Sequence, residues 1–318
     1  MQEEGQSIEE FIPLYLRRFI YPYHGDFCYT RLFHARLIAQ LMSEGFLPIA
    51  TEGVLLPKLH EHRCVISLPG DLHVSKSVRK KSRKFAVTIN KAFDEVVEGC
   101  RAQHGSHCWL YPPLVDAFKS IMSAEKVDAV IMEDGRRPTN RTCPVRLYSL
   151  EVWNESTGEL AGGELGYTVG SIYTSLTGFA AEDSAGSVQL AALGRLLCRI
   201  GFSLWDLGME MEYKKGLGSH LMPRKVFVEH VHAVRESKSS LVLPVGQEPQ
   251  NAKTIIDYSS VQPDAADSMA KETKQLSISK QQNVKHQPSF NDDNPAPDRK
   301  KRRNSDPADN ASQQIEVN

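Results

Sequence analysis

The segment between residues 146 and 178 constrains the fold most, because it reads as three consecutive β-strands. Its first part alternates apolar and polar residues, and turn-forming residues interrupt it at Asn154–Gly158 and again at Gly170. The expected strands are Leu147–Trp153, Glu159–Thr168 and Ser171–Thr177. Strands joined by such short connections pair antiparallel, so the sequence predicts an antiparallel sheet here.

A helix and a buried strand are expected next. Ser184 is a suitable N-cap and Gly201 a suitable C-terminal stop, and leucines recur on one helical stripe between them, which predicts a helix that ends at Ile200. The mostly apolar run Phe202–Met209 reads as a buried strand. This order of sheet, helix and strand resembles the acetyltransferase-type α/β architecture at the level of the fold alone.

Other helices and short strands flank this unit. Apolar spacing predicts helices at Phe11–Ile20, Leu32–Glu44, Lys91–Cys100 (with Asn90 as its N-cap), Pro113–Ser123 and Pro223–Glu236. Short strands are expected at Phe46–Ala50, Gly53–Leu56, Cys64–Leu68 and Phe85–Ile89, whereas Ala124–Pro144 reads mostly as a loop. The predicted class is α/β (α+β), with a small N-terminal α+β domain over residues 1–62 and an acetyltransferase-like (GNAT-type) mixed sheet with flanking helices over 63–236.

The composition changes at about Ser237 to polar and charged residues with almost no aromatics. Such a segment buries too little apolar surface to offset the entropy lost on ordering, so we expect residues 237–318 to be a disordered tail. The tail contains the basic run Arg299–Arg303. This run fits a nuclear import signal, a nucleic-acid tether or a solvated charge cluster.

Composition also predicts where the protein acts. The formal net charge is −1, so the chain as a whole does not attract nucleic acid. No apolar stretch reaches the roughly 20 residues of a membrane helix, and the acidic start Met1–Glu10 does not resemble a secretory signal. The six cysteines form no Cys-x-x-Cys pair and match no common zinc spacing. We therefore expect reduced thiols, no metal and no membrane contact in a cytoplasmic protein.

A basic stretch interrupts this even balance of charge. Its cations are Lys76, Arg79, Lys80, Lys81, Arg83 and Lys84. Like charges at this density repel one another unless a polyanion compensates them, which favours binding of nucleic-acid phosphates with release of counterions. A solvated lysine-rich loop is the alternative, and the residues alone leave both open.

Two single residues are further candidates for chemistry. Trp109 precedes Pro112 and Pro113, where its ring could stack on a nucleobase or belong to the core. Asp206 lies in an apolar run, where a carboxylate is costly to bury unless it is paired or used. It is therefore a candidate base or orienting group, with a structural salt bridge as the alternative.

Several short motifs occur in the order and spacing of one known family. They are Glu44-Gly-Phe-Leu-Pro48, Leu72-His-Val-Ser-Lys-Ser77, Phe93-x-x-Val-x-Glu-Gly-Cys100, Cys108-Trp-Leu110, Ser149-Leu-Glu-Val-Trp153, Leu160-Ala-Gly-Gly163, Leu204-Trp-Asp206, Leu217-Gly-Ser219 and Pro223-Arg-Lys-x-Phe227. With these motifs, the chain from about Asp26 to His230 resembles the leucyl/phenylalanyl-tRNA–protein transferases.

This resemblance implies a function and its partners. Members of the family move an amino acid from charged tRNA to the N-terminal amine of a protein, which marks that protein for degradation. The partners implied are aminoacyl-tRNA and proteins with a free N-terminus, with no cofactor and a monomeric state. The larger domain over 63–236 would be the catalytic domain.

The resemblance also assigns roles to residues. The Lys76–Lys84 stretch would hold the phosphates of the tRNA acceptor stem. Trp109, Tyr173, Leu176 and Phe179 would contribute to the site of the aminoacyl-adenosine. Asp206 falls at the family's catalytic Asp, where it would orient the amine or accept its proton.

The chain departs from the family pattern at several of these positions. Leu176 replaces an acid of a Gly-Glu-Ser-x-Phe segment, Gly208 replaces a Gln, and Tyr213 replaces a His. Ile49 and Phe118 stand where the family has Trp and Tyr. The missing acid at Leu176 removes a partner for a basic residue at the acceptor N-terminus. We therefore expect a changed acceptor or donor preference, such as acidic N-termini or another aminoacyl group.

Two other functions stay open. A catalytically weak tRNA- or degron-binding module with the same fold would tolerate these departures. An acyl-CoA-dependent acetyltransferase would use Tyr213–Gly218 as a pyrophosphate loop, although the segment lacks the usual first residue of such loops.

Overall fold

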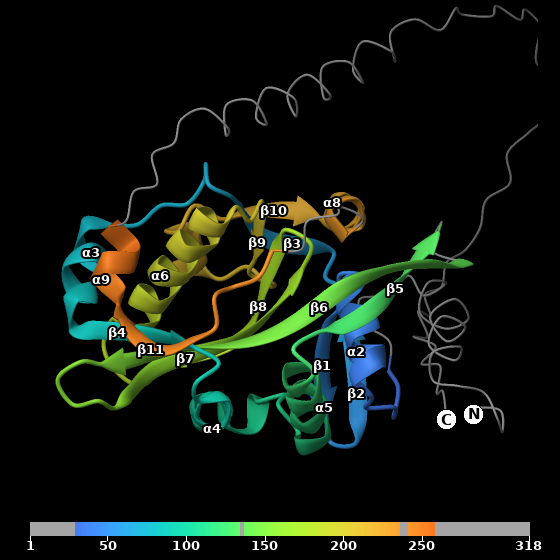
Figure 1. The fold of residues 1–318 in the computed structure, drawn as a ribbon, viewed down its shortest axis with the longest axis horizontal. Coiled ribbons are helices and arrows are strands. Elements are labelled where there is room, and N and C mark those ends of the chain that lie inside the picture. Colours follow the sequence, from blue (N-terminus) through green and yellow to red (C-terminus); the bar gives the residue numbers. More distant parts are fainter. Residues whose placement is uncertain (1–28, 134–136, 236–240, 258–318) are drawn as a thin grey trace, which may run out of the picture. The chain divides into compact units, whose positions relative to one another are not determined.

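A nine-stranded mixed sheet dominates the computed structural model, which describes residues 29–133, 137–235 and 241–257 (Figure 1). The strand order is β10-β3-β9-β8-β7-β6-β4-β11, with β5 paired to β6, and a separate two-stranded sheet joins β1 and β2. The strands are β1 (Leu47–Thr51), β2 (Val54–Lys58), β3 (His62–Ser67), β4 (Phe85–Ile89), β5 (Val127–Glu133), β6 (Arg137–Asn154), β7 (Leu160–Val169), β8 (Ile172–Ala180), β9 (Leu204–Asp206), β10 (His220–Pro223) and β11 (Gly246–Asn251). The predicted α/β class is confirmed, whereas the acetyltransferase likeness stays a prediction.

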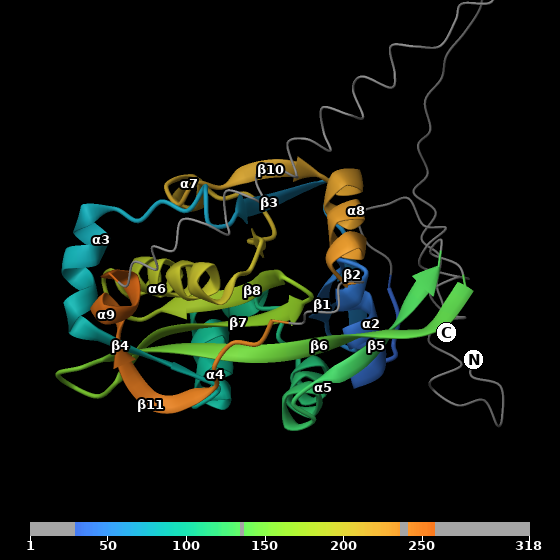
Figure 2. The same ribbon diagram turned by 45° about the horizontal axis from the view of Figure 1, so that its top comes forward.

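Helices cover both faces of this sheet (Figure 2). They are α2 (Ala35–Ser43), α3 (Lys76–Lys81), α4 (Phe93–His104), α5 (Pro112–Ser123), α6 (Ala185–Ile200), α7 (Glu212–Lys215), α8 (Arg224–Arg235) and α9 (Ala252–Asp257). One apolar core joins α2, α4 and α5 to the sheet, and a second core joins α6 and α9 to the opposite face. No helix in the described ranges is long and apolar enough to cross a membrane.

The central strands follow the pattern that their sequence predicts. β6, β7 and β8 pair antiparallel in chain order, and β9 then pairs parallel to β8 after α6 has crossed the sheet. Gly170 forms the tight β7–β8 turn at a φ of +56°, and Gly201 ends α6 at a φ of +97°. Gly194 lets α6 approach Trp205 on β9, because a Cβ there would lie 2.9 Å from the indole ring.

The stretch predicted as a loop, Ala124–Pro144, instead contributes to the hairpin of β5 and β6. Prolines and charged residues hide the strand pattern of this segment. The side chain of Gln40 on α2 bonds to both the N–H (2.8 Å) and the carbonyl (2.7 Å) of Val130. The free edge of β5 is thereby satisfied by a residue about 90 positions away, which local sequence patterns do not reveal.

The ordered chain also extends further than predicted. Within the segment expected to be a disordered tail, β11 pairs with β4, and α9 buries Ala252, Ile255 and Ile256. Asn251 begins α9 by accepting the backbone N–H of Lys253 at 3.0 Å. This short amphipathic stretch is hidden by the polar average of the tail. The basic run at 299–303 and the helix expected at 11–20 lie outside the described residues.

The predicted cap at Asn90 is wrong, and the one at Ser184 is confirmed in position only. Helix α4 begins at Phe93, and Asn90 lies before it at a φ of +60°, where its side chain accepts the backbone N–H of Ser149. Ser184 does precede α6, but at a φ of +75° and without a capping hydrogen bond. The elements of the predicted N-terminal domain share an apolar core with the rest of the described chain. The domain boundary near residue 62 stays a prediction.

Candidate functional site

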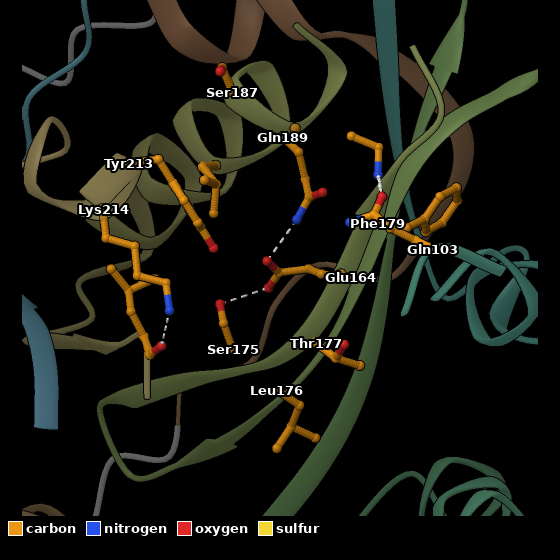
Figure 3. Close-up of a pocket in the computed structure, with 15 residues that line it drawn as sticks. Gln103, Glu164, Ser175, Leu176, Thr177, Phe179, Ser187, Gln189, Tyr213 and Lys214 are labelled. Carbon is orange, nitrogen blue, oxygen red and sulfur yellow. Dashed lines mark hydrogen bonds between the residues drawn. The ribbon is translucent and has the colours of Figure 1, made fainter. Parts of the chain in front are cut away.

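A pocket of about 330 Å³ lies between strands β7 and β8 and helices α6 and α7 (Figure 3). The strands contribute Glu164, Ser175, Leu176 and Phe179 to its wall. The helices contribute Gln189, Leu190, Tyr213 and Lys214. The wall therefore combines apolar side chains with hydrogen-bonding groups, which is the usual character of a small-molecule site.

Glu164 stands at the centre of this pocket (Figure 3). Its Oε1 accepts hydrogen bonds from the hydroxyls of Tyr173 and Ser175, both at 2.9 Å. Its Oε2 accepts a hydrogen bond of 2.7 Å from the Nε2 of Gln189 on α6. The carboxyl group thus joins two strands to the helix that covers them.

Burial raises the pKa of Glu164 to about 7, although its three donors and the charge of Lys214 act in the opposite direction. The position of the side chain follows from the strand register. Glu164 pairs with Gly178 on β8, and a Cβ on Gly178 would lie only 3.1 Å from the Cβ of Glu164. Gly178 therefore leaves room for the side chain of Glu164 in a layer that is otherwise filled. With a pKa of about 7, the carboxyl group of Glu164 changes charge near neutral pH.

Helix α7 forms the opposite wall. The hydroxyl of Tyr213 points toward the centre of the pocket, while much of its ring is exposed (Figure 3). The Nζ of Lys214 donates to the carbonyl oxygens of Leu207 (2.8 Å) and Met209 (2.7 Å). Burial lowers the pKa of Lys214. The lysine therefore fixes the chain after β9 instead of pairing with Glu164.

The end of helix α4 lies at the rim formed by β8. The Oε1 of Gln103 accepts the backbone N–H of Ala180 at 2.8 Å. The ring of His104 lies 3.0 Å from the carbonyl oxygen of Gly178. These contacts fix the strand that bears Leu176 and Phe179.

Asp206 lies in a buried ion pair and is not part of the pocket wall. Its carboxylate accepts two 2.9 Å hydrogen bonds from Arg63, and both side chains are fully buried. It also accepts the hydroxyl of Thr174 at 3.0 Å and the N–H of Gly208 at 2.9 Å. The residue thus joins β3, β8 and β9, and the structural salt bridge that the sequence left open is present.

Arg63 is held as firmly as its partner. Its guanidinium donates to the carbonyl of Gly45 at 3.1 Å and lies over the ring of Phe227, 4.5 Å from the centroid. Burial acts to lower the pKa of Arg63, but the charge and hydrogen bonds of Asp206 outweigh it, and the pKa is raised. The guanidinium therefore stays charged although it is fully buried.

The predicted basic stretch forms helix α3 and the turn after it, Ser82–Lys84. Arg79 pairs with Asp257 of α9 at 3.3 Å, and the Nζ of Lys81 donates to the Oγ of Ser184 at 2.9 Å. Ser184 immediately precedes α6, whose residues Gly186 and Ser187 line the pocket. Lys81 of this stretch therefore lies near the end of α6 that reaches the pocket.

The other predicted site residues are only partly brought together. Leu176 and Phe179 line the pocket, and Tyr173 lies behind it with its hydroxyl bonded to Glu164. Trp109 is half-buried against the core around α4 and α5 and does not belong to the pocket wall. The roles assigned to these residues stay predictions.

Glu164, Gln189 and Lys214 are not among the site residues predicted from the sequence. The sequence did contain one signal for Glu164: it is the lone acid of the strand segment Leu160–Val169, and its neighbours there are apolar or small. It places a carboxylate in the pocket although Leu176 replaces the acid that the family pattern has on β8. Within the described ranges, no three His, Cys, Asp or Glu residues are grouped to hold a metal ion.

Comparison with known proteins agrees with the motifs. Residues 65–232, more than half of the chain, match the family described as leucyl/phenylalanyl-tRNA protein transferase. This match spans the basic stretch, the pocket and Asp206. The structure is that of a mixed α/β protein whose pocket is lined by a helix that contacts a basic helix. With this match, the chain belongs to the leucyl/phenylalanyl-tRNA protein transferase family.

Individual relatives carry the same name. The leucyl/phenylalanyl-tRNA–protein transferase of Pectobacterium atrosepticum is 27% identical over 168 residues, which are 52% of this chain and 62% of that protein. The protein of that name from Desulfatibacillum aliphaticivorans is 26% identical over 217 residues, 67% of this chain and 81% of its own length. The one from Stutzerimonas stutzeri is 28% identical over 168 residues, 52% and 65% respectively. The chain thus spans less than two thirds of the first and third of these relatives.

Proposed function

We propose that this protein is an enzyme, an aminoacyl-tRNA–protein transferase that moves an amino acid from charged tRNA to the N-terminal amine of an acceptor protein and so creates an N-degron. Its family and the names of its relatives support this reaction. We further propose that it acts in the cytoplasm as a monomer, a location that fits the free cysteines of the described chain.

One observation carries the proposal: the basic helix α3 contacts α6, the helix that lines the pocket. Lys81 donates to Ser184 at the start of α6, two residues before the first pocket residue of that helix, Gly186. Phosphates of an acceptor stem on α3 would neutralise its cations and direct the 3′ end of the tRNA toward the pocket. A pocket without adjacent cations would not favour a nucleic-acid substrate.

The chemistry needs little beyond correct placement. The amine nitrogen attacks the ester carbonyl carbon, the amide C–N bond forms, the ester C–O bond breaks, and the proton lost by the amine ends on the 3′-oxygen of the tRNA. The ester is already activated, and an α-amine has a pKa of about 7.7–8.0, so a useful fraction is neutral at pH 7. Holding the two groups together supplies much of the rate.

We assign Asp206 a positioning role in this reaction. Its carboxylate is fully buried, is paired with the guanidinium of Arg63 and is not part of the pocket wall. Its bonds to Thr174 and Gly208 hold β8 and the chain after β9, where Leu207 lines the pocket. Direct contact between Asp206 and the amine, as the family resemblance implies, remains the competing hypothesis.

The buried state of Asp206 also favours the second candidate function, a tRNA- or degron-binding module with weak catalysis. The test is transfer of labelled amino acids from bulk charged tRNA to peptides that differ only in their first residue. We expect transfer that falls at least about tenfold in the double variant Lys80→Ala/Lys84→Ala, with the buried but pocket-remote variant Glu151→Gln as the control. Binding of tRNA without transfer to any peptide would establish the module instead.

A further inference from the structure

We propose that Glu164 determines the donor amino acid: the pocket selects an aminoacyl group whose side chain ends in a cation, of the lysine or arginine type. This inference rests on the proposed function, because it names the donor of the same reaction. It is carried by the position of Glu164, by the partners of its carboxylate and by the composition of the surrounding wall.

The carboxylate is buried but not saturated. Glu164 is 3% exposed and accepts hydrogen bonds from Tyr173, Ser175 and Gln189. An ionised carboxylate has about four acceptor positions. Three are in use, all by neutral groups, and the side chain projects into the pocket (Figure 3). One acceptor position is therefore left for a ligand.

No cation of the described chain compensates this charge directly. The nearest candidate, Lys214, gives its hydrogen bonds to the carbonyl oxygens of Leu207 and Met209. Glu164 is also absent from the ion pairs found among the described residues, in contrast to the buried acids Asp206 and Glu44. Burying an unpaired carboxylate is costly, and a cationic ligand would recover part of that cost.

The remaining wall fits the stem of such a side chain. Leu190 and the ring of Tyr213 supply apolar surface on the side of the sheet that bears the carboxyl group, whereas Leu176 and Phe179 pack with the core on the other face (Figure 3). Lysine and arginine side chains lay their methylene groups along apolar surface and keep the charged end on a polar partner. A leucyl or phenylalanyl side chain would contact the same walls but leave Glu164 desolvated and facing an apolar group.

The inference is tested by binding and by transfer. Binding is measured by calorimetry with two stable analogues, 3′-lysylamido- and 3′-leucylamido-3′-deoxyadenosine, at pH 8. Transfer is measured from tRNAs charged singly with Lys, Arg, Leu or Phe to one fixed acceptor peptide. The variants are Glu164→Gln, which keeps the shape, and Glu164→Leu, which removes the polarity. Glu151→Gln is the matched control, because Glu151 is a buried, hydrogen-bonded carboxyl outside the pocket.

We expect the parent protein to bind the lysyl analogue at least about tenfold more tightly than the leucyl analogue, the ratio expected for one hydrogen-bonded charge. Glu164→Gln should reduce this ratio toward one, Glu164→Leu should reverse it, and Glu151→Gln should leave it unchanged. A parent protein that prefers the leucyl analogue overturns the inference without any variant, as does a failure to bind either analogue.

The two proposals fail separately in this design. If the lysyl preference follows Glu164 but no charged tRNA supports transfer, the pocket assignment stands and the transferase activity does not. If transfer occurs from Leu- or Phe-tRNA and is unaffected by Glu164→Gln, the transferase stands and Glu164 is a structural group that fastens α6 to the sheet.

Discussion

Replacement of Asp206 by asparagine removes one charge from a fully buried ion pair and keeps the shape of the side chain. With its amide oxygen at the Oδ1 position, the new side chain would still accept the Nε–H of Arg63 and the N–H of Gly208, both now at 2.9 Å. Its NH₂ group would replace Oδ2, which now accepts from the Nη2 of Arg63 at 2.9 Å and from the hydroxyl of Thr174 at 3.0 Å. The perturbation therefore leaves a buried guanidinium without a counter-charge.

The magnitude follows from the burial of both partners. Breaking a buried pair from one side costs about 3–5 kcal/mol, because the remaining charge is desolvated and unpaired. The retained hydrogen bonds and the ring of Phe227 beside Arg63 place the expected loss near the lower end, about 3 kcal/mol. This is a large part of the roughly 5–15 kcal/mol that stabilises a typical domain.

Urea unfolding of parent and variant measures this loss directly. We expect a lower midpoint with an unchanged slope, and Glu159→Gln, which alters an exposed acid, should stay within about 0.5 kcal/mol of the parent. At urea concentrations well below its unfolding midpoint, the Asp206→Asn variant should keep part of the parental transfer activity, because we assign Asp206 only the role of holding the strands. A variant of parental stability without transfer would refute this reasoning and establish a direct role for Asp206 in the reaction.

Three further predictions concern other parts of the fold. The pKa of Glu164 is raised from 4.5 to about 7 in the folded protein, so its stabilising contribution is complete below pH 4.5 and is lost as the pH rises through 7. In urea titrations, the stability of Glu164→Gln relative to the parent should therefore rise by about 3 kcal/mol between pH 4.5 and 8. Gly218→Ala should reduce the free energy of unfolding by more than about 1 kcal/mol beyond the reduction caused by Gly53→Ala. Both glycines have a positive φ, but only at Gly218 would a Cβ overlap a backbone carbonyl, and equal melting temperatures of the two variants would contradict this. Lys80→Ala/Lys84→Ala should lower the slope of log Kd for tRNA against log salt by about 2 in filter binding, and an unchanged slope would remove these cations from the interface.

The local sequence pattern determined the central architecture. Alternating residues and short turns in 146–178 predict β6, β7 and β8, and the leucine stripe with Gly201 predicts α6 and its end. These elements follow from neighbours within a few positions, because side-chain direction in strands and helices repeats with a fixed period. The density of cations in Lys76–Lys84 was equally visible, and the family motifs predicted a family that the comparisons confirm.

Local patterns failed where distant residues decide the structure. The edge of β5 is completed by Gln40, and α9 is held because its apolar side chains meet α6 and the second core. Neither contact is visible in the local pattern or in the average composition, so both segments were predicted wrongly. The cap assigned to Asn90 was wrong because the side chain found a partner on β6 instead. In each case a contact across the chain outweighed the local preference.

The site itself was decided by tertiary structure. Sequence identified Asp206 as an acid that must be paired or used, but only the fold brings it to Arg63, 143 positions away, and seals it from the pocket. Conversely, the sequence around Glu164 does not show its role, because Tyr173, Ser175 and Gln189 are brought to its carboxyl group only by the fold. A carboxyl group's charge and role depend on burial and on the donors in reach, and these are properties of the packed chain, not of neighbouring residues in the sequence.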